Sequence, residues 1–194
     1  QIATTFEAFG LDTYRKKFPG LGEYYHSGRE SGRQKSPSEY ARDLVEFMDG
    51  LHEQYENRIF YIFLDPSAKG LAEEVRRATR TGLDYQVFLR DAENDVAFGI
   101  SRVQKALVFD IMSISPKQEY AVQEFGTYEY DKKSIEKGKE VPVKEADHCM
   151  DAIRYVVMGA WSKIKHWLPL DIVEDDVNIG DISSREVREE DEYL

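Results

Sequence analysis

The stretch that decides how this chain is interpreted is Lys144-Glu145-Ala146-Asp147-His148-Cys149-Met150-Asp151-Ala152-Ile153-Arg154-Tyr155. In a helix, Asp147, His148 and Asp151 share one face, because residues three and four apart are neighbours. The residues of the opposite face are apolar and predict packing on a core: Ala146, Cys149, Met150, Ile153, Val156, Val157 and Ala160. Two carboxylates and an imidazole on a rigid helix indicate a divalent-metal edge. The alternative is a solvated stripe in which Asp151 simply pairs with Arg154.

Around this helix, the patterns of apolar and turn-forming residues predict an α/β chain. β-branched and aromatic residues predict a meander of three antiparallel strands, at 2–11, 14–18 and 21–27. Ser36, Pro37 and Glu39 predict a capped helix start, and the helix continues to Leu51. The elements expected after it are a strand at 59–64, a helix at 70–81, a strand at 85–89, a helix at 93–109, a strand at 111–115, a helix at 119–125, a polar hairpin or loop at 127–143 and the long helix at 144–167.

A second acid follows the most apolar strand. The run from Ile59 to Leu64 is apolar throughout, which is typical of a central strand covered on both faces. Asp65 comes directly after it, at the edge where open α/β sheets bind ligands. The alternative role for Asp65 is to cap the following turn through the amides of Ser67 and Ala68. The order of the elements and their acids favours an α/β, ribonuclease H-like fold, with a mixed central sheet flanked by helices on both faces.

Such a layout brings Asp65 together with Asp147 and Asp151 around two divalent ions, held roughly 3.5–4 Å apart. Carboxylates are hard oxygen ligands, and they favour Mg²⁺ or Mn²⁺ over zinc. His148 is either a weak ligand, a group that supports the ligands, or a surface imidazole. The residues therefore predict metal-dependent hydrolysis, with Asp65, Asp151 and His148 as the catalytic candidates.

The net charge of −11 argues against a general nucleic-acid-binding surface. A nuclease can still be acidic if its metal ions and one basic edge face the DNA. The candidates for such an edge are Arg29, Arg33, Lys35, Lys132 and Lys133. A solvated loop and a soluble hairpin are the alternatives for these residues. The loop at 28–35 lacks the G-x-x-x-x-G-K-[ST] pattern, so the chain is not expected to hydrolyse nucleotides.

The 194 residues suit one domain, expected at 1–168, followed by an acidic tail at 169–194. The single cysteine, Cys149, excludes an internal disulfide and a cysteine zinc cluster. The chain has no apolar run of the ~18 residues that a membrane span needs. A soluble, intracellular protein without membrane contact is expected, and the missing initiator methionine predicts a fragment.

Several of these segments resemble one known family. Phe63-Leu64-Asp65-Pro66-Ser67-Ala68 and the stretch from Ala146 to Tyr155 both look like the large terminase subunit of tailed bacteriophages. The segment from Tyr24 to Glu30, with the loop Gly32-Arg33-Gln34, is similar to the same family. The resemblance runs from about Thr4 to Trp167 and covers only the C-terminal nuclease domain of that family.

The resemblance implies an endonuclease that cuts concatemeric phage DNA at the start and end of packaging. Asp65 and Asp151 correspond to two of the family's metal-binding acids, and Asp147 and His148 match the flanking positions. The family's first acid lies on its first strand, in an Asp-Tyr-Gly-Thr-like element just before the stretch that corresponds to Thr4-Thr5-Phe6, and this sequence has no such element. Glu7 comes too late in the strand to replace it.

The resemblance also implies the surroundings of the chain. The substrate is double-stranded DNA, the full-length protein carries an N-terminal ATPase domain, and the partners are the small terminase subunit and the portal or procapsid. The expected location is the cytoplasm of the infected bacterial host. The alternative function, favoured by the missing first acid, is a noncatalytic ribonuclease H-like module that docks DNA or a capsid or portal partner.

Overall fold

The computed structural model describes residues 3–129, 131, 142–143 and 147–172. Strands and helices alternate along most of this chain. In chain order the elements are β1 (Ala3–Phe9), β2 (Phe18–Ser27), α1 (Pro37–Tyr55), β3 (Ile59–Leu64), α2 (Lys69–Ala78), β4 (Gln86–Asp91), α3 (Val96–Val108), β5 (Met112–Ser113), α4 (Glu119–Thr127), α6 (His148–Ile164) and a 3₁₀ turn, η1 (Lys165–Trp167).

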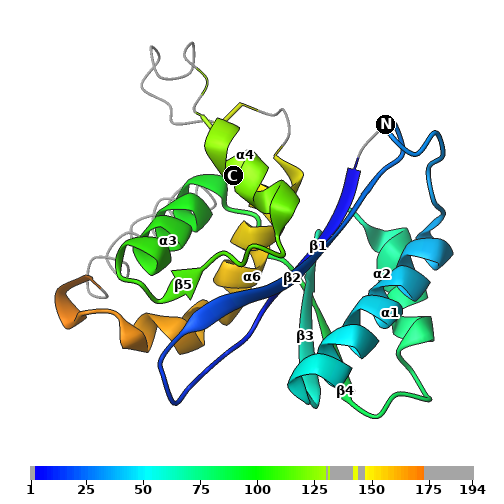
Figure 1. Ribbon diagram of the computed structural model, residues 1–194, viewed down its shortest axis with the longest axis horizontal. Coiled ribbons are helices and arrows are strands. Elements are labelled where there is room, and N and C mark those ends of the chain that lie inside the picture. The colour runs from blue at the N-terminus through cyan, green and yellow to red at the C-terminus, as the bar shows by residue number, and fades with distance from the viewer. Residues whose placement is uncertain (1–2, 130, 132–141, 144–146, 173–194) are drawn as a thin grey trace, which may run out of the picture.

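The described strands form two sheets. A mixed three-stranded sheet has the order β1-β2-β5, with β1 antiparallel and β5 parallel to β2, and a second sheet pairs β3 and β4 in parallel. The helices α1 and α2 lie on one side of these strands, and α3, α4 and α6 lie on the other (Figure 1). The expected α/β fold with a mixed sheet between helices is thus confirmed.

Local sequence signals explain the first helix. The Ser36 hydroxyl accepts a hydrogen bond from the Glu39 amide, and the Glu39 carboxylate accepts one from the Ser36 amide at 2.8 Å. This is the predicted capping box, which satisfies two amides that the helix leaves unpaired. The buried side chains of α1 recur at helical spacing: Tyr40, Ala41, Leu44, Met48 and Leu51.

The expected strand at 14–18 is wrong. A backbone bridge between Asp12 and Lys17 closes a turn there, and β2 starts only at Phe18. Tyr14 is 94% exposed in that turn, so its aromatic ring contributes nothing to a sheet. The meander therefore has two strands, which pair with Thr5 opposite Tyr25.

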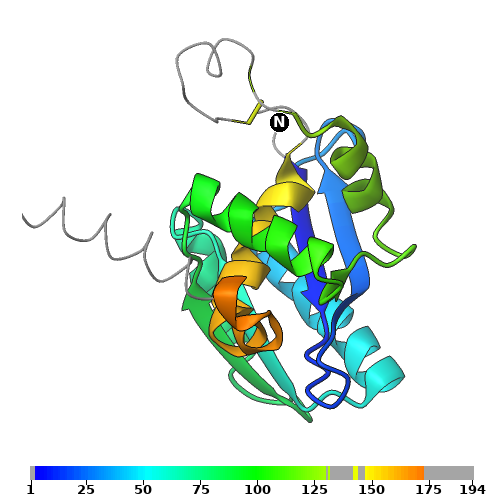
Figure 2. The ribbon, with the colours of Figure 1, turned by 90° about the vertical axis from the view of Figure 1, so that its left-hand side faces the viewer.

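Helix α6 is the centre of the larger core. Its buried face includes Ile153, Val157, Trp161 and Ile164, and α3 crosses it on the outer side (Figure 2). At Gly159 the helix approaches β3 closely, because a Cβ there would lie 2.1 Å from Cε1 of Phe63. This contact places the end of β3, and therefore Asp65, beside α6.

Strand β3 is less covered than the sequence predicted. Ile59 and Tyr61 are 53% and 52% exposed, so the expected burial on both faces is wrong for this end of the strand. The reason is that α6 packs against the Phe63 end of β3, while in the described residues β3 has only β4 as a neighbour in its sheet.

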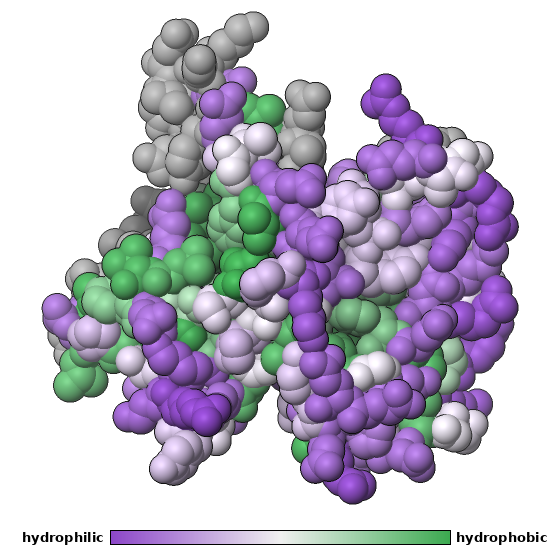
Figure 3. Space-filling model, in the orientation of Figure 1, coloured by the Kyte–Doolittle hydropathy of each residue, from purple (hydrophilic) through white to green (hydrophobic). Residues whose placement is uncertain are grey.

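Side chains over α1 and α2 are mostly hydrophilic, and apolar ones gather over α3 (Figure 3). Among the described helices, none combines the length and apolar character needed to cross a membrane.

Candidate metal site at the end of β3

Asp65 takes the capping role that the sequence allowed, and it also contacts the late helix. Its Oδ1 accepts a hydrogen bond from the Ser67 amide at 2.7 Å, and its main-chain carbonyl accepts one from the Ala68 amide, so it caps the turn before α2. Its other carboxylate oxygen, Oδ2, accepts a hydrogen bond at 2.9 Å from the hydroxyl of Tyr155 on α6. One oxygen therefore shapes the turn, and the other meets the late helix.

These contacts determine the protonation states of Asp65 and Tyr155. Partial burial tends to raise the pKa of Asp65, but the hydrogen bonds from Ser67 and Tyr155 and the positive charge of Arg154 outweigh it and lower the pKa. Burial and the hydrogen bond to the Asp65 carboxylate raise the pKa of Tyr155 to about 12. At neutral pH Asp65 is therefore a carboxylate, and Tyr155 keeps its proton.

Asp151 lies in the same hydrogen-bonded chain. Nη2 of Arg154 donates to Oδ1 of Asp151 at 2.7 Å, which is the ion pair considered as the alternative role for this acid. The guanidinium also reaches Oδ1 of Asn94, and the Tyr155 hydroxyl lies 3.3 Å from the same oxygen. A continuous chain thus runs from Asp65 through Tyr155, Asn94 and Arg154 to Asp151.

Glycine makes room for the buried arginine. Arg154 is 2% exposed, and a Cβ at Gly99 of α3 would lie 2.3 Å from its Cγ. A glycine inside a helix costs about 1 kcal/mol relative to alanine, so the close approach of Arg154 explains why it stands there. By contrast, the Asp151 side chain is 40% exposed and faces solvent.

Asp147 and His148 stand at the start of α6. Asp147 precedes the helix, and its Oδ1 lies 3.9 Å from Nδ1 of His148. The Asp151 amide donates to the Asp147 carbonyl at 2.9 Å, one turn further along. Among the described residues, no hydrogen bond joins the side chain of Asp147 or His148 to the Asp65 chain.

A second polar cluster, which the sequence did not reveal, lies where β1, β2 and α6 meet. Potential ligand atoms of Glu7, Glu23 and Cys149 lie within 4.8 Å of one another. Gln118 donates to Glu7 at 2.8 Å, and the Cys149 sulfur lies 3.7 Å from a Glu23 oxygen.

Burial raises the pKa of Glu7 to about 8 and also raises the pKa of the Cys149 thiol. Metal ligation needs both groups deprotonated. Both shifts favour the protonated forms and so oppose metal ligation, and the described contacts within the cluster are hydrogen bonds. Cys149 itself is buried, as expected.

Asp65 and Asp151 fit a hard divalent cation in their chemistry. Asp65 is an ionised oxygen donor, and Asp151 presents an exposed carboxylate at the other end of the hydrogen-bonded chain. In the described part of the chain, however, no group of three close metal-ligating side chains includes either acid. The two acids are linked through Tyr155, Asn94 and Arg154, and a complete metal site needs further ligands.

Two residues of the predicted DNA-binding edge already form ion pairs within the protein. Nη2 of Arg33 lies 2.6 Å from Glu39, and Nζ of Lys35 lies 2.6 Å from Asp43. Arg29 is exposed in the same loop. Lys132 and Lys133 lie outside the described residues.

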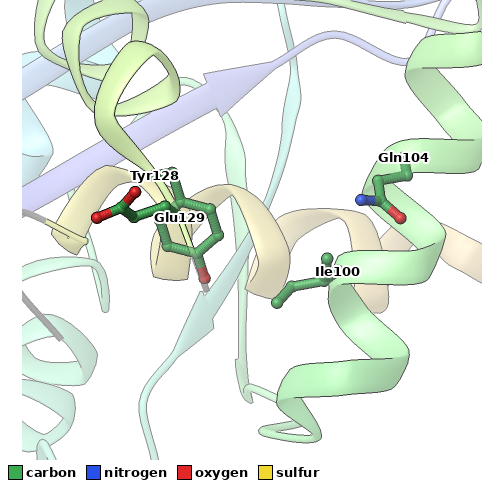
Figure 4. Close-up of a pocket in the computed structure, with 4 residues that line it drawn as sticks. All are labelled: Ile100, Gln104, Tyr128 and Glu129. Carbon is green, nitrogen blue, oxygen red and sulfur yellow. The ribbon is translucent and has the colours of Figure 1, made fainter. Parts of the chain in front are cut away.

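The surface also has a small hollow of about 100 Å³ between α3 and the segment after α4. Ile100 and Gln104 line it from α3, and Tyr128 and Glu129 line it from the opposite side (Figure 4). None of the predicted site residues lines this hollow.

The fold and the sequence are similar to part of a large terminase. Structures of the large terminase from a thermophilic bacteriophage match with 30% identity and a TM-score of 0.69 (ADP complex), and with 31% identity and a TM-score of 0.67 (ATP-gamma-S complex). Another crystal form of the same terminase matches with 32% identity and a TM-score of 0.66. Each match covers 81% of this chain but only 36% of the terminase chain, so this chain spans about a third of that protein's length. Models of protein families and curated proteins give no match.

Proposed function

We propose that this chain is the endonuclease domain of a phage DNA-packaging terminase, which cuts concatemeric double-stranded DNA by metal-dependent phosphodiester hydrolysis. The observation that carries the proposal is the hydrogen-bonded chain that links Asp65, at the carboxyl end of β3, to Asp151 on α6 through Tyr155, Asn94 and Arg154. The similarity to a large terminase supports it independently.

In this proposal, Asp65 and Asp151 hold Mg²⁺ or Mn²⁺, with Asp147 as a further ligand and two ions in the complete site. Bound divalent ions supply a metal-activated water and stabilise the leaving oxygen of the phosphodiester. Asp65 contributes an ionised carboxylate at neutral pH. Tyr155 orients this carboxylate through a hydrogen bond and stays neutral itself. His148 supports the ligands from the half-buried start of α6.

The first-strand acid of the resembling family, which this sequence lacks, is a further candidate ligand. In the described chain, β1 pairs only with β2 and β3 only with β4, while α6 packs against both β1 and β3. Each of the two strands therefore keeps an edge without a ladder partner, beside the same helix. We propose that the family's first strand, with its acid, fits between these edges and brings a further carboxylate to the site.

We propose that Arg29, Lys132 and Lys133 contact the phosphate backbone of the DNA, while Arg33 and Lys35 mainly order the loop through their ion pairs.

The structures of the similar terminase hold ADP or ATP-gamma-S. Because this chain has no phosphate-binding loop, we assign nucleotide binding to an N-terminal ATPase domain of the full-length protein. We also propose that the full-length protein works with the small terminase subunit and with the portal or procapsid, in the cytoplasm of the bacterial host.

Calorimetric titration with Mn²⁺ tests the site. We expect a binding signal from the wild-type chain that is lost in Asp65→Asn and Asp151→Asn, because each change removes a ligand charge and little volume. Asp84→Asn, at an exposed position, is the matched control. In a chain extended by the first-strand acid, Asp151→Asn should also abolish plasmid nicking, and undiminished cutting would reject the assignment.

A noncatalytic module that docks DNA or a capsid or portal partner is the second candidate. The observation that favours it is that Arg154 and Tyr155 already satisfy the two acids. No Mn²⁺ signal at millimolar concentration, together with retained DNA binding, would support this module over the nuclease.

A further inference from the structure

One amide oxygen joins the two halves of the candidate site. Oδ1 of Asn94 lies 3.3 Å from both Nη1 and Nη2 of Arg154 and 3.3 Å from the hydroxyl of Tyr155. A guanidinium has donors and no acceptor, so the Asn94 side chain must turn its oxygen, and not its nitrogen, toward Arg154. The two Arg154 nitrogens therefore converge on this oxygen, and the Tyr155 hydroxyl shares its single hydrogen between it and Asp65, with Asp65 nearer.

The same donors hold the two acids. Nη2 of Arg154 donates to Asp151 at 2.7 Å, and the Tyr155 hydroxyl donates to Asp65 at 2.9 Å. Arg154 and Tyr155 are adjacent on α6, so their side chains diverge from neighbouring points of one helix. Asn94 draws the ends of the two side chains together, and this sets where each of them meets its acid.

The place of Asn94 is well defined. It follows β4, and the next residue, Asp95, caps α3 by accepting a hydrogen bond from the Phe98 amide at 2.9 Å. Arg154 is almost fully buried, and a buried guanidinium needs acceptors for its donors to offset the loss of water. Its Nε already lacks a partner among the described residues, so losing Asn94 would leave further donors unsatisfied.

We propose that Asn94 is a positioning residue that sets the spacing and orientation of Asp65 and Asp151 through Tyr155 and Arg154. The role rests on the proposed function, since it assigns Asn94 to the same metal site. Asn94 itself touches neither acid in the contacts described, so it acts through its two neighbours. Nothing in the sequence motifs pointed to it.

The first test needs no metal. Nitrogen NMR of Arg154 reports whether its guanidinium is held, because hydrogen bonds on both nitrogens slow its rotation and keep the Nη1 and Nη2 signals apart. We expect separate signals in the wild-type chain, merged signals in Asn94→Leu, and separate signals again in Asn94→Asp, which keeps an acceptor oxygen. Separate signals in Asn94→Leu would overturn the proposal.

The second test is the Mn²⁺ titration. Loss of a residue that orients metal ligands typically lowers metal affinity about 10–100-fold, and we expect a loss of this size in Asn94→Leu and its recovery in Asn94→Asp. Asp95→Ala is the stability control, because it removes the cap of α3 and leaves the acceptor of Arg154 in place. An equal loss in Asp95→Ala would show that the helix start alone matters and would contradict the role of Asn94.

The two tests separate this proposal from the proposed function. If the wild-type chain and Asp65→Asn both give no Mn²⁺ signal, the metal site fails. The guanidinium spectra then still decide whether Asn94 holds Arg154: merged signals in Asn94→Leu support that part, and separate signals overturn it.

Discussion

The hydroxyl of Tyr155 donates a hydrogen bond to the carboxylate of Asp65 at 2.9 Å, and this contact joins the end of β3 to the first turns of α6. The two residues are 90 positions apart in the sequence. They meet because Gly159 lets α6 approach Phe63, two residues before Asp65.

The first prediction concerns this contact. Tyr155→Phe should lower the free energy of unfolding by about 1.5–3 kcal/mol near neutral pH, the range for a hydrogen bond to a charged group. The folded-state pKa of Asp65 is lowered, so its contribution is present above the unfolded pKa and is lost as the pH falls through the folded pKa. Urea unfolding at several pH values should therefore show the difference shrinking in acid. Tyr14→Phe, at an exposed ring, should show no difference at any pH.

The second prediction concerns Glu7. Its folded-state pKa is raised by burial from 4.5 to about 8, so the folded state holds a proton that the unfolded state releases. This group's contribution to stability is present below pH 4.5 and is lost as the pH rises toward 8. Thermal unfolding of Glu7→Gln should show a flatter pH dependence and a higher Tm than the wild type at about pH 8–9. The control is Glu53→Gln, on the exposed face of α1, which should leave the pH profile of Tm unchanged. An unchanged profile in Glu7→Gln would show that Glu7 is not protonated in the folded state.

The third prediction concerns the start of α6. Oε2 of Glu124 accepts hydrogen bonds from the amides of Cys149 at 2.7 Å and Met150 at 3.2 Å, and so performs the capping that Asp147 does not. Glu124→Ala should lower the free energy of unfolding by about 2 kcal/mol, because it leaves buried amides without an acceptor. Glu124→Gln keeps a carbonyl oxygen and should lose less. Urea unfolding measures both variants, and equal losses would argue against the capping role.

The fourth prediction compares two helical glycines. Gly99→Ala should destabilise the protein, because the new Cβ would lie 2.3 Å from Cγ of Arg154. Gly50→Ala, in α1, meets nothing within 4 Å and should stabilise it by about 0.5–1 kcal/mol, as helix propensity predicts. Thermal unfolding distinguishes the two, and a stabilising Gly99→Ala would contradict the close packing of Arg154.

The fifth prediction concerns DNA. If exposed Arg29 contacts a phosphate, Arg29→Ala should reduce the slope of log affinity against log salt by about 0.9. Arg33→Ala should change the slope less, because Arg33 is paired with Glu39 at 2.6 Å. Fluorescence anisotropy of a labelled duplex across a salt series measures both. Equal slopes for Arg29→Ala and the wild type would remove Arg29 from the proposed DNA-binding edge.

Much of the fold could be predicted because its signals are local. The capping box at Ser36 and the apolar spacing of α1 depend on residues within a few turns of one another, and the structure confirms both. The strand expected at 14–18 failed because β propensity measures how well a side chain packs, and Tyr14 has no neighbouring strand to pack against.

By itself, the sequence determined most of the order of the elements, the position of Asp65 after β3 and of Asp151 on α6, and the apolar face of α6, since these follow from the types and spacing of nearby residues. Only the tertiary structure decided which groups those acids meet: Tyr155 on Asp65, Arg154 on Asp151, and Asn94 between them. It also decided that Glu7, Glu23 and Cys149 share one buried cluster. The physical reason is that hydrogen bonds and burial depend on which side chains are close in space. Asp65 and Tyr155 are 90 residues apart, and no local sequence pattern predicts that two such distant residues will meet.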